Sequence, residues 1–250
     1  MTPDRQVEVL DGRNLALHGG SPESSTWETV FNTGNRLLVR ERVERSATTS
    51  WHSHGERDTF GVVLKGRLSI EYGPDHAVAV EEGEFFYVPA EVVHREIAGE
   101  AVEAVVMFSG DGPPRVCASE PAQSPETAPQ VAGEDDLVPT KKLENLVRRQ
   151  PFPDAPVQQV HGYTGGAMTS EWHHHGENEV FGHVLRGRGY VDLLEGDPEE
   201  TLATAGDFFH IPPGITHRDV NPVDEEQEYL LWIVGSGPRV IRAEPPKTVQ

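Results

Sequence analysis

An internal repeat is the feature that most constrains what this 250-residue chain can fold into. The stretch TSWHSHGERDTFGVVLKGRL, which begins at Thr49, returns at Ser170 as SEWHHHGENEVFGHVLRGRG. A second stretch, EEGEFFYVPAEVVHRE from Glu81, returns at Thr204 as TAGDFFHIPPGITHRD. Two similar stretches in the same order indicate two copies of one fold.

The segment between the copies, Ala118–Asp136, is rich in Pro, Ala, Ser and acidic residues and poor in large apolar residues. This composition is typical of a linker. We therefore predict an N-terminal domain over residues 1–117, a linker over 118–136 and a C-terminal domain over 137–250.

Each copy has the pattern of short strands. Runs such as FGVVLKGRLSIEYG, from Phe60, combine β-branched and aromatic residues and end in glycine turns. Several such runs in each copy favour an all-β sandwich or barrel. The exception is the start of the second copy, where Leu143, Leu146 and Val147 have helical spacing and indicate a short helix.

An excess of acidic residues limits the partners of the chain. It has 41 Asp and Glu against 21 Lys and Arg, which gives a formal charge of −20. Nucleic-acid backbones and anionic membrane surfaces repel such a charge. No apolar run approaches the ~20 residues of a membrane helix, and the first residues lack the apolar core of a signal peptide. We expect a cytoplasmic protein with no nucleic-acid or membrane partner.

Histidines recur at matching places in the two copies. Side chains two residues apart on a strand point to one face, so a His-x-His pair can bind one metal ion. A third histidine follows each pair behind a Pro-containing turn. His174 aligns with Ser53, so we expect it to face away. Imidazole suits Fe, Ni, Cu, Zn or Mn. The predicted ligands are His52, His54 and His94 in the first copy and His173, His175 and His217 in the second.

These motifs resemble those of the cupin family, whose first motif is His-x-His followed by Glu and Gly, and whose second contains Pro-x-Gly, His and Asn. The first copy departs from the second motif, because Glu91 replaces its Gly and Ala98 its Asn. The resemblance implies an all-β protein with two cupin domains in tandem, each a double-stranded β-helix or jelly roll. The second copy fits the second motif in full through Gly206, Pro212, Gly214, His217 and Asn221.

The carboxylate of the first motif has two candidate places. Counting forward from the histidine pair gives Glu179 in the second copy, with Asp58 as its counterpart. Counting back from Gly187 gives Val180 instead, and Thr59 in the first copy. A β-bulge would reconcile the two counts. We favour Glu179 and Asp58 as ligands, with a three-histidine site completed by water as the alternative.

Two further residues are candidate acid–base groups. Glu177 and its counterpart Glu56 lie two residues after the histidine pair, and they are also a rival pair of ligands. His183 shares the strand face of Glu179 and would enter the barrel with it. We therefore name His183 and Glu177 as candidate catalytic residues, with a hydrogen-bonded strand histidine as the alternative for His183.

Three functions are compatible with such a site. The resemblance implies a metal-dependent enzyme with one divalent ion per domain, above all an Fe²⁺ or Ni²⁺ dioxygenase that acts with O₂ on a small enolisable or aromatic molecule. Mn²⁺, Zn²⁺ and Cu²⁺ are further options. A redox-neutral isomerase, cyclase or decarboxylase would use the ion as a Lewis acid. A non-catalytic cupin would only bind a small ligand or metal. We expect the second copy to carry the main reaction, in a monomer or homo-oligomer.

Overall fold

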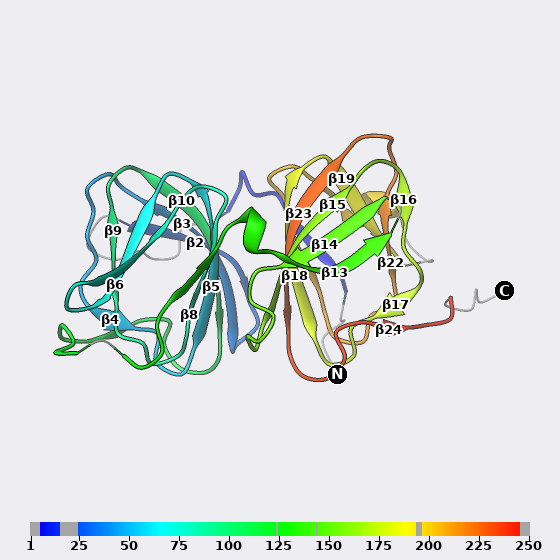
Figure 1. The fold of residues 1–250 in the computed structure, drawn as a ribbon. Helices are drawn as coiled ribbons and strands as arrows, with labels where there is room; N and C mark the ends of the chain where they lie inside the picture. Colours follow the sequence, from blue (N-terminus) through cyan, green and yellow to red (C-terminus); the bar gives the residue numbers. More distant parts are fainter. Residues whose placement is uncertain (1–5, 16–24, 124, 144, 194–196, 246–250) are drawn as a thin grey trace. The chain divides into compact units, whose positions relative to one another are not determined.

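The computed structural model describes residues 6–15, 25–123, 125–143, 145–193 and 197–245. Over these residues the regular structure is almost entirely β-strand, and no α-helix is present. Two short 3₁₀ turns, η1 (Glu134–Asp136) and η2 (Pro198–Thr201), are the other regular elements. The all-β fold is therefore confirmed, and Figure 1 shows its strands gathered into two β units. Within the same residues, no helix has the length and apolar character needed to cross a membrane.

Two compact units divide the chain at boundaries that differ from the expected domain limits. The N-terminal unit is Leu15–Leu137, and the C-terminal unit combines Val138–Gln250 with the start of the chain up to Asn14. Strand β1 (Glu8–Leu10) accordingly pairs with β21 (Phe208–Ile211) of the C-terminal unit.

Part of the expected linker belongs to the fold of the N-terminal unit. Its strand β12 (Gln130–Ala132) forms the edge of a sheet by pairing with β8 (Phe85–Val88), as β1 does on β21 in the other unit. Residues 118–136 therefore include a paired strand rather than only a connection.

The N-terminal unit is a sandwich of two sheets. Its six-stranded sheet has the order β12-β8-β5-β10-β3-β2, and a three-stranded sheet has the order β7-β6-β9. Buried side chains from both sheets, such as Val63, Phe86, Ile70 and Val80, form one core. The remaining strands are β2 (Ser25–Asn32), β3 (Arg36–Val43), β4 (His52–Ser53), β5 (Asp58–Lys65), β6 (Leu68–Gly73), β7 (His76–Val80), β9 (Arg95–Ala98), β10 (Val102–Ser109) and β11 (Val116–Cys117).

The C-terminal unit repeats this arrangement. A seven-stranded sheet has the order β1-β21-β18-β23-β15-β14-β13, and a four-stranded sheet has the order β16-β22-β19-β20. Val180, Val191 and Ile211 pack between them. The remaining strands are β13 (Val138–Leu143), β14 (Leu146–Gln150), β15 (Gln158–Thr164), β16 (Met168–Thr169), β17 (His173–His174), β18 (Glu179–Arg186), β19 (Arg188–Asp192), β20 (Leu202–Thr204), β22 (Arg218–Asn221), β23 (Gln227–Val234) and β24 (Ile241–Arg242).

The short helix expected at the start of the second copy is wrong. Strands β13 (Val138–Leu143) and β14 (Leu146–Gln150) pair antiparallel, and β14 continues the sheet by pairing with β15. This pairing buries Leu146 and gives the backbone groups on one edge of β15 hydrogen-bond partners that a helix would not supply. At this place, pairing with the edge of the sheet outweighs the helical spacing of the apolar residues.

One repeated glycine explains the Phe-Gly dipeptide of both copies. A Cβ on Gly61 would lie 2.1 Å from the ring of Phe86, and one on Gly182 would lie 2.0 Å from the ring of Phe209. Only glycine lets the neighbouring strand lay an aromatic ring across the backbone at this place.

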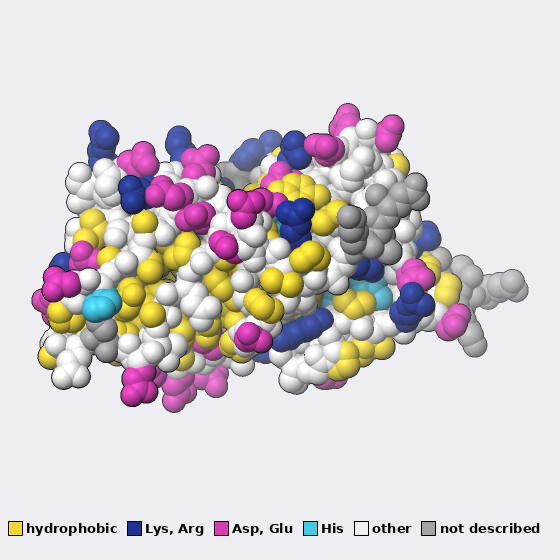
Figure 2. Space-filling model, viewed as in Figure 1, with side chains coloured by type: hydrophobic (Ala, Val, Ile, Leu, Met, Phe, Trp, Pro, Cys, Tyr) yellow, Lys and Arg dark blue, Asp and Glu magenta, His cyan; other side chains and the backbone are white. Residues whose placement is uncertain are grey.

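On one face of the molecule, the acidic side chains do not form a single patch. On the face drawn in Figure 2, Asp and Glu side chains are scattered among Lys and Arg side chains rather than gathered in one patch. The histidines that recur in both copies are instead buried.

Candidate metal centres

Each centre begins with two histidines that face each other across a backbone pair. His52 on β4 and His94 exchange backbone hydrogen bonds of 2.9 and 2.8 Å. His173 on β17 and His217 do the same at 2.8 Å in both directions. Directly opposite residues of an antiparallel pair carry their side chains on one face. The imidazole centroids are therefore only 4.5 Å apart in the first pair and 4.4 Å apart in the second.

The third histidine of each centre comes two residues after the first, as the His-x-His spacing predicts. His54 and His175 return to the face of the opposed pair. In each centre, ligand nitrogens of the three histidines lie within 4.8 Å of one another. We call His52, His54, His94 and Glu96 the N-terminal cluster, and His173, His175 and His217 the C-terminal cluster.

All six rings are oriented in the same way. Each Nδ1 lies 2.5 to 2.9 Å from a backbone carbonyl oxygen. Because a carbonyl only accepts hydrogen bonds, Nδ1 carries a proton, and in the neutral ring Nε2 then keeps its lone pair. Metal-binding histidines are typically fixed by such a hydrogen bond on the second nitrogen. The accepting carbonyls belong to Ser50, Pro114 and Val92 in the N-terminal cluster and to Glu171, Arg239 and Ile215 in the C-terminal cluster.

Burial favours the neutral, metal-binding form of these rings. The six histidines are at most 5% exposed. Loss of hydration lowers the pKa of His52 to about 4 and that of His175 to about 3. It also lowers the pKa of His54 and His217. These four imidazoles are thus neutral near pH 7 without needing a metal to displace a proton.

The surroundings of two buried ring nitrogens show whether a metal ion would fit each cluster. His217 Nε2 is buried and has no hydrogen-bond partner among the described residues, and the buried His94 Nε2 has the carboxylate of Glu96 beside it at 3.2 Å. A buried polar atom without a partner is costly unless a ligand completes it. A divalent ion bound by the three Nε2 lone pairs of a cluster would satisfy these atoms. Both sets of histidines therefore fit a metal.

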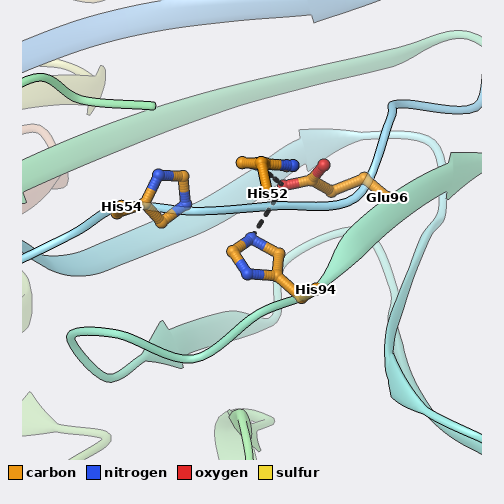
Figure 3. A group of neighbouring side chains, drawn as sticks. All are labelled: His52, His54, His94 and Glu96. Atoms are coloured by element: carbon orange, nitrogen blue, oxygen red, sulfur yellow. Dashed lines mark ion pairs between the residues drawn. The ribbon is translucent and has the colours of Figure 1, made fainter. Parts of the chain in front are cut away.

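A carboxylate joins the N-terminal cluster from a position that the first motif does not contain. Glu96 on β9 lies two residues after His94, and its Oε1 is 3.2 Å from His94 Nε2 and 3.6 Å from His52 Nε2 (Figure 3). The Thr49 hydroxyl donates to Oε2 at 2.5 Å. Burial opposes ionisation, yet the two histidines and Thr49 hold the pKa of Glu96 well below its usual range. Glu96 completes a set of three imidazoles and one carboxylate.

The C-terminal cluster has the corresponding acid at a longer distance. Asp219 Oδ1 is 3.9 Å from His217 Nε2, and Oδ2 is 3.9 Å from His173 Nε2. Arg148 Nη2 donates to Oδ2 at 2.9 Å. Although burial opposes ionisation, Arg148 and the histidines hold the pKa of Asp219 well below its usual range. This centre therefore consists of three histidines beside an ion-paired carboxylate.

The structure brings neither Asp58 nor Glu179 to its cluster. Asp58 accepts a hydrogen bond of 2.7 Å from the Tyr87 hydroxyl and one of 3.2 Å from the Ala90 N–H. Glu179 Oε2 lies 3.2 Å from His210 Nε2. Both expected ligands thus have partners outside the two histidine clusters.

The position of a bulge explains where these two acids lie. Thr59 and Val180 line the cavities, so strand alternation turns the acid before each of them to the opposite face. The register shifts come later, at Leu64 in β5 and at Leu185 in β18. They absorb the extra residue before the glycine without turning the acid inward. Counting back from the glycine identifies the inward position, which holds no carboxylate in either copy.

The two candidate catalytic residues also lie outside the C-terminal cluster. His183 shares the face of Glu179, which is the face away from the cavity. Its ring stacks on Phe208 at 4.1 Å, and its Nδ1 is 3.1 Å from the Asp207 carbonyl oxygen. Glu177 is exposed in the turn after His175. The structure places both away from the predicted ligands.

The N-terminal cavity contains two charged residues besides the cluster. Glu41 on β3 accepts a 2.8 Å hydrogen bond from Trp27 Nε1. Burial and the nearby Glu96 raise the pKa of Glu41 to about 7. Arg115 also lines the cavity, whereas most of the wall is apolar. A cation and a protonatable carboxyl group therefore face the same space as the cluster.

The C-terminal cavity is built differently. Arg148 and Tyr229 line it together with His175 and Asp219, and the rest of the wall is largely apolar. Arg148 Nε donates to the Tyr229 hydroxyl at 2.9 Å. Its acidic and basic side chains are therefore paired with each other.

Sequence reasoning missed Glu96 and Asp219, although the repeat contains their signal. HRE and HRD follow the same turn in the two copies, and a residue two positions after a histidine on a strand shares its face. No such signal identifies Glu41, because its place in the second copy is taken by Gly162.

Comparison with known proteins agrees with this geometry. The Cupin domain family matches residues 39–109 and 160–234. Among curated proteins, no sequence match was found. Oxalate decarboxylase from Bacillus subtilis at pH 4.6 has a similar structure, with a TM-score of 0.70 and 12% identity over 94% of this chain and 78% of that chain.

Two further solved structures are similar. The formate complex of Lactobacillus farciminis oxalate decarboxylase has a TM-score of 0.72 and 14% identity, over 94% of this chain and 88% of that chain. A structure of the Bacillus subtilis enzyme from work on its Mn(II) centres has a TM-score of 0.69 and 12% identity, over 94% and 79%. At these identities the likeness establishes the fold, with two β units in one chain.

Proposed function

We propose a function for this chain from the premise that it belongs to the cupin family. The chain is a metal-dependent enzyme, and its N-terminal cavity converts a small carboxylate substrate without net oxidation. Decarboxylation, isomerisation and cyclisation are the reactions of this class. One observation carries the proposal: three buried imidazoles, Glu96, Arg115 and Glu41 all face one mainly apolar cavity.

The cluster supports a divalent ion of the Mn²⁺, Fe²⁺ or Ni²⁺ kind. Imidazole nitrogens with one carboxylate oxygen are ligands that these ions accept. When bound, such an ion supplies Lewis-acid chemistry, because it polarises a carbonyl or carboxylate oxygen and stabilises developing negative charge. The Mn(II) centres named for the Bacillus subtilis enzyme agree with this range of metals.

Arg115 supports a carboxylate substrate. Its Nη2 donates to the Ser50 carbonyl at 3.2 Å, which fixes the side chain beside the His52 segment. A guanidinium is the side chain best suited to bind a carboxylate. The corresponding Arg239 instead donates to Asn178 and to the carbonyls of Gly235 and Pro156. A cation lining the cavity thus favours the N-terminal unit as the reaction site.

Glu41 supports a step that moves a proton. Its pKa of about 7 leaves part of the population protonated near neutral pH, which is the range in which a carboxyl group works as an acid or a base. Trp27 holds the side chain in place through Nε1. The apolar wall limits water around it, so a proton released there has few competing acceptors.

The proposed reaction site in the N-terminal cavity replaces the expectation that the second copy carries the main reaction. The second copy matches the family motifs more closely, but its acid Asp219 is paired with Arg148 and its candidates His183 and Glu177 lie outside the cluster. The first copy departs from the second motif yet holds a carboxylate against its histidines. We therefore propose Glu96, rather than Asp58, as the fourth ligand in the N-terminal cluster.

A redox-neutral reaction is favoured over the dioxygenase expected from sequence. The solved structures with a similar fold that are described above are oxalate decarboxylases, and Arg115 provides a site for a carboxylate. An Fe²⁺ or Ni²⁺ dioxygenase is the alternative that the experiment decides.

The test uses the full chain loaded with Mn²⁺, Fe²⁺ or Ni²⁺ in turn. It is incubated with a panel of small mono- and dicarboxylates, 2-oxo acids, β-dicarbonyls and phenols. Substrate loss, CO₂ release and O₂ uptake are measured together. We expect turnover of a carboxylate without stoichiometric O₂ uptake, lost in His94→Ala and reduced at least about 100-fold in Glu41→Gln.

The contrary outcomes are distinct. O₂ uptake equal to substrate loss would establish a dioxygenase instead. Absence of turnover with confirmed metal loading would favour a non-catalytic binding protein. Turnover that survives His94→Ala and is lost in His217→Ala would place the reaction in the C-terminal unit.

A further inference from the structure

The same row of three strands is occupied differently in the two units. In the N-terminal unit, Trp27 lies opposite Glu41, and Glu41 lies opposite Ala104. In the C-terminal unit the equivalent row across β14, β15 and β23 is Arg148, Gly162 and Tyr229. All three members of the N-terminal row line the cavity of that unit, and Arg148 and Tyr229 of the C-terminal row line the other cavity. The exchange therefore changes what surrounds each metal centre.

In the C-terminal unit, Arg148 holds the acid beside the histidines. Its side chain is buried, with Nη2 on Asp219 at 2.9 Å and Nε on Tyr229 at 2.9 Å. Tyr229 can lie there because Gly162 has no side chain, since a Cβ on Gly162 would be 2.3 Å from the tyrosine ring. The guanidinium is thus anchored at two points and cannot leave Asp219 by turning to solvent.

In the N-terminal unit the residue at the place of Arg148 is Trp27, which supplies no positive charge to Glu96. Trp27 Nε1 donates to Glu41 rather than to Glu96. Glu96 keeps one oxygen on the Thr49 hydroxyl and turns the other toward the histidines. Its closest approach to a ring nitrogen is 3.2 Å, compared with 3.9 Å for Asp219.

We propose that Arg148 sets the ligand number of the C-terminal centre by holding Asp219 away from a bound metal ion. The N-terminal centre then binds a metal with three histidines and Glu96, and the C-terminal centre with three histidines. The proposal rests on the metal-binding part of the proposed function and does not depend on the reaction. Arg148 acts here as a positioning residue, because it acts on the metal through Asp219.

The physical reason is a competition for one carboxylate. A buried carboxylate needs a positive partner, and Arg148 provides one at hydrogen-bond distance. Without that charge, a metal ion at the three Nε2 atoms becomes the nearest cation, and Asp219 gains a charge-compensating partner by turning toward it. A fourth, anionic ligand raises the affinity for a divalent ion.

The test measures metal binding at the C-terminal centre alone, in a full-length His94→Ala background that removes an N-terminal ligand. The variants are Arg148→Met, which keeps the aliphatic stem, Arg148→Lys, which keeps the charge, Asp219→Asn, and the double variant Arg148→Met/Asp219→Asn. Affinity for Co²⁺ and the visible spectrum of bound Co²⁺ are recorded for each. The spectrum of the N-terminal centre, taken in a His217→Ala background, serves as the reference for a four-ligand site.

We expect Arg148→Met to tighten Co²⁺ binding by roughly 10-fold or more and to move its spectrum toward the N-terminal reference. Asp219→Asn alone should change binding little, and it should abolish the gain in the double variant. Arg148→Lys should keep the parent spectrum. Thermal unfolding of each variant checks the fold, and Tyr229→Phe provides a milder release of Arg148 if Arg148→Met does not fold.

Two results would overturn the proposal. If Asp219→Asn alone weakens binding about as much as Glu96→Gln does at the N-terminal centre, Asp219 is already a ligand. If folded Arg148→Met and Tyr229→Phe both keep the parent affinity and spectrum, Arg148 does not control the ligand set. Neither result depends on finding a substrate, so a failed activity screen leaves this test intact.

Discussion

Glu96 Oε1 lies 3.2 Å from Nε2 of His94, the residue two positions before it on the chain. The spacing works because both side chains leave the same face of an extended segment. The same segment therefore supplies a carboxylate as well as an imidazole to the N-terminal cluster. This relationship distinguishes the N-terminal cluster from the C-terminal cluster, in which the nearest carboxylate oxygen is 3.9 Å from a ring nitrogen.

Replacing Glu96 by Gln should weaken metal binding at the N-terminal centre. The change removes the anionic oxygen but keeps the size of the side chain and an acceptor for Thr49. We expect at least about a 10-fold loss of affinity, the range found when even the outer partners of metal ligands are removed. Competition with a chromophoric chelator, in a His217→Ala background, measures it.

The matched control is Asp58→Asn, the same acid-to-amide change at the ligand expected from sequence. An amide oxygen can still accept from the Tyr87 hydroxyl. We expect unchanged metal affinity for this variant. A loss equal to that of Glu96→Gln would restore Asp58 as a ligand.

Replacing Glu179 by Gln should affect stability rather than metal binding. Glu179 is paired with His210 at 3.2 Å, on the strand face away from the cavity. We expect a loss of roughly 1.5 kcal/mol in unfolding free energy, the lower end of the range for a hydrogen bond to a charged group. Metal content of the C-terminal centre, measured in parallel by elemental analysis, should stay at the parental value. A drop in metal content without unfolding would argue against this placement.

Glu41 predicts a pH dependence of stability with a definite sign. Its folded pKa of about 7 lies above the ordinary value of 4.5, so between these pH values the folded chain keeps a proton that the unfolded chain has lost. The unfolding free energy therefore falls as the pH rises from 4.5 through 7. The contribution is on the order of 2 kcal/mol between pH 5 and 8.

Glu41→Gln should remove this contribution. Denaturant unfolding of chelator-treated parent and variant at pH 5 and pH 8 gives the comparison. The variant should gain stability relative to the parent as the pH rises. An equal difference between the two proteins at both pH values would mean that Glu41 does not titrate in this range.

The repeat made the fold and the histidine positions predictable. His52, His54 and His94 align with His173, His175 and His217, and the alternation of strand side chains explains why His174 is not in the cluster. These inferences need only a register between two copies, which the sequence itself contains.

The orientation of Asp58 and Glu179 was not predictable from the same counting. The face of Glu179 depends on where a bulge lies in β18, and the register shift at Leu185 has no distinctive residue to mark it. The pairing of β1 with β21 was not predictable either, because a three-residue edge strand is defined by its partner rather than by its own sequence pattern. The antiparallel pair β13–β14 has the same cause, since sheet pairing outweighs the helical spacing of Leu146 and its neighbours.

Metal titration of the chelator-treated full chain tests the central claim most directly. The claim is that the N-terminal cluster is the complete four-ligand centre and the C-terminal cluster the weaker, three-histidine centre. We predict two binding events of different affinity, with the tighter one lost in His94→Ala and the weaker one lost in His217→Ala. Loss of the tighter event in His217→Ala, with its retention in His94→Ala, would contradict the account.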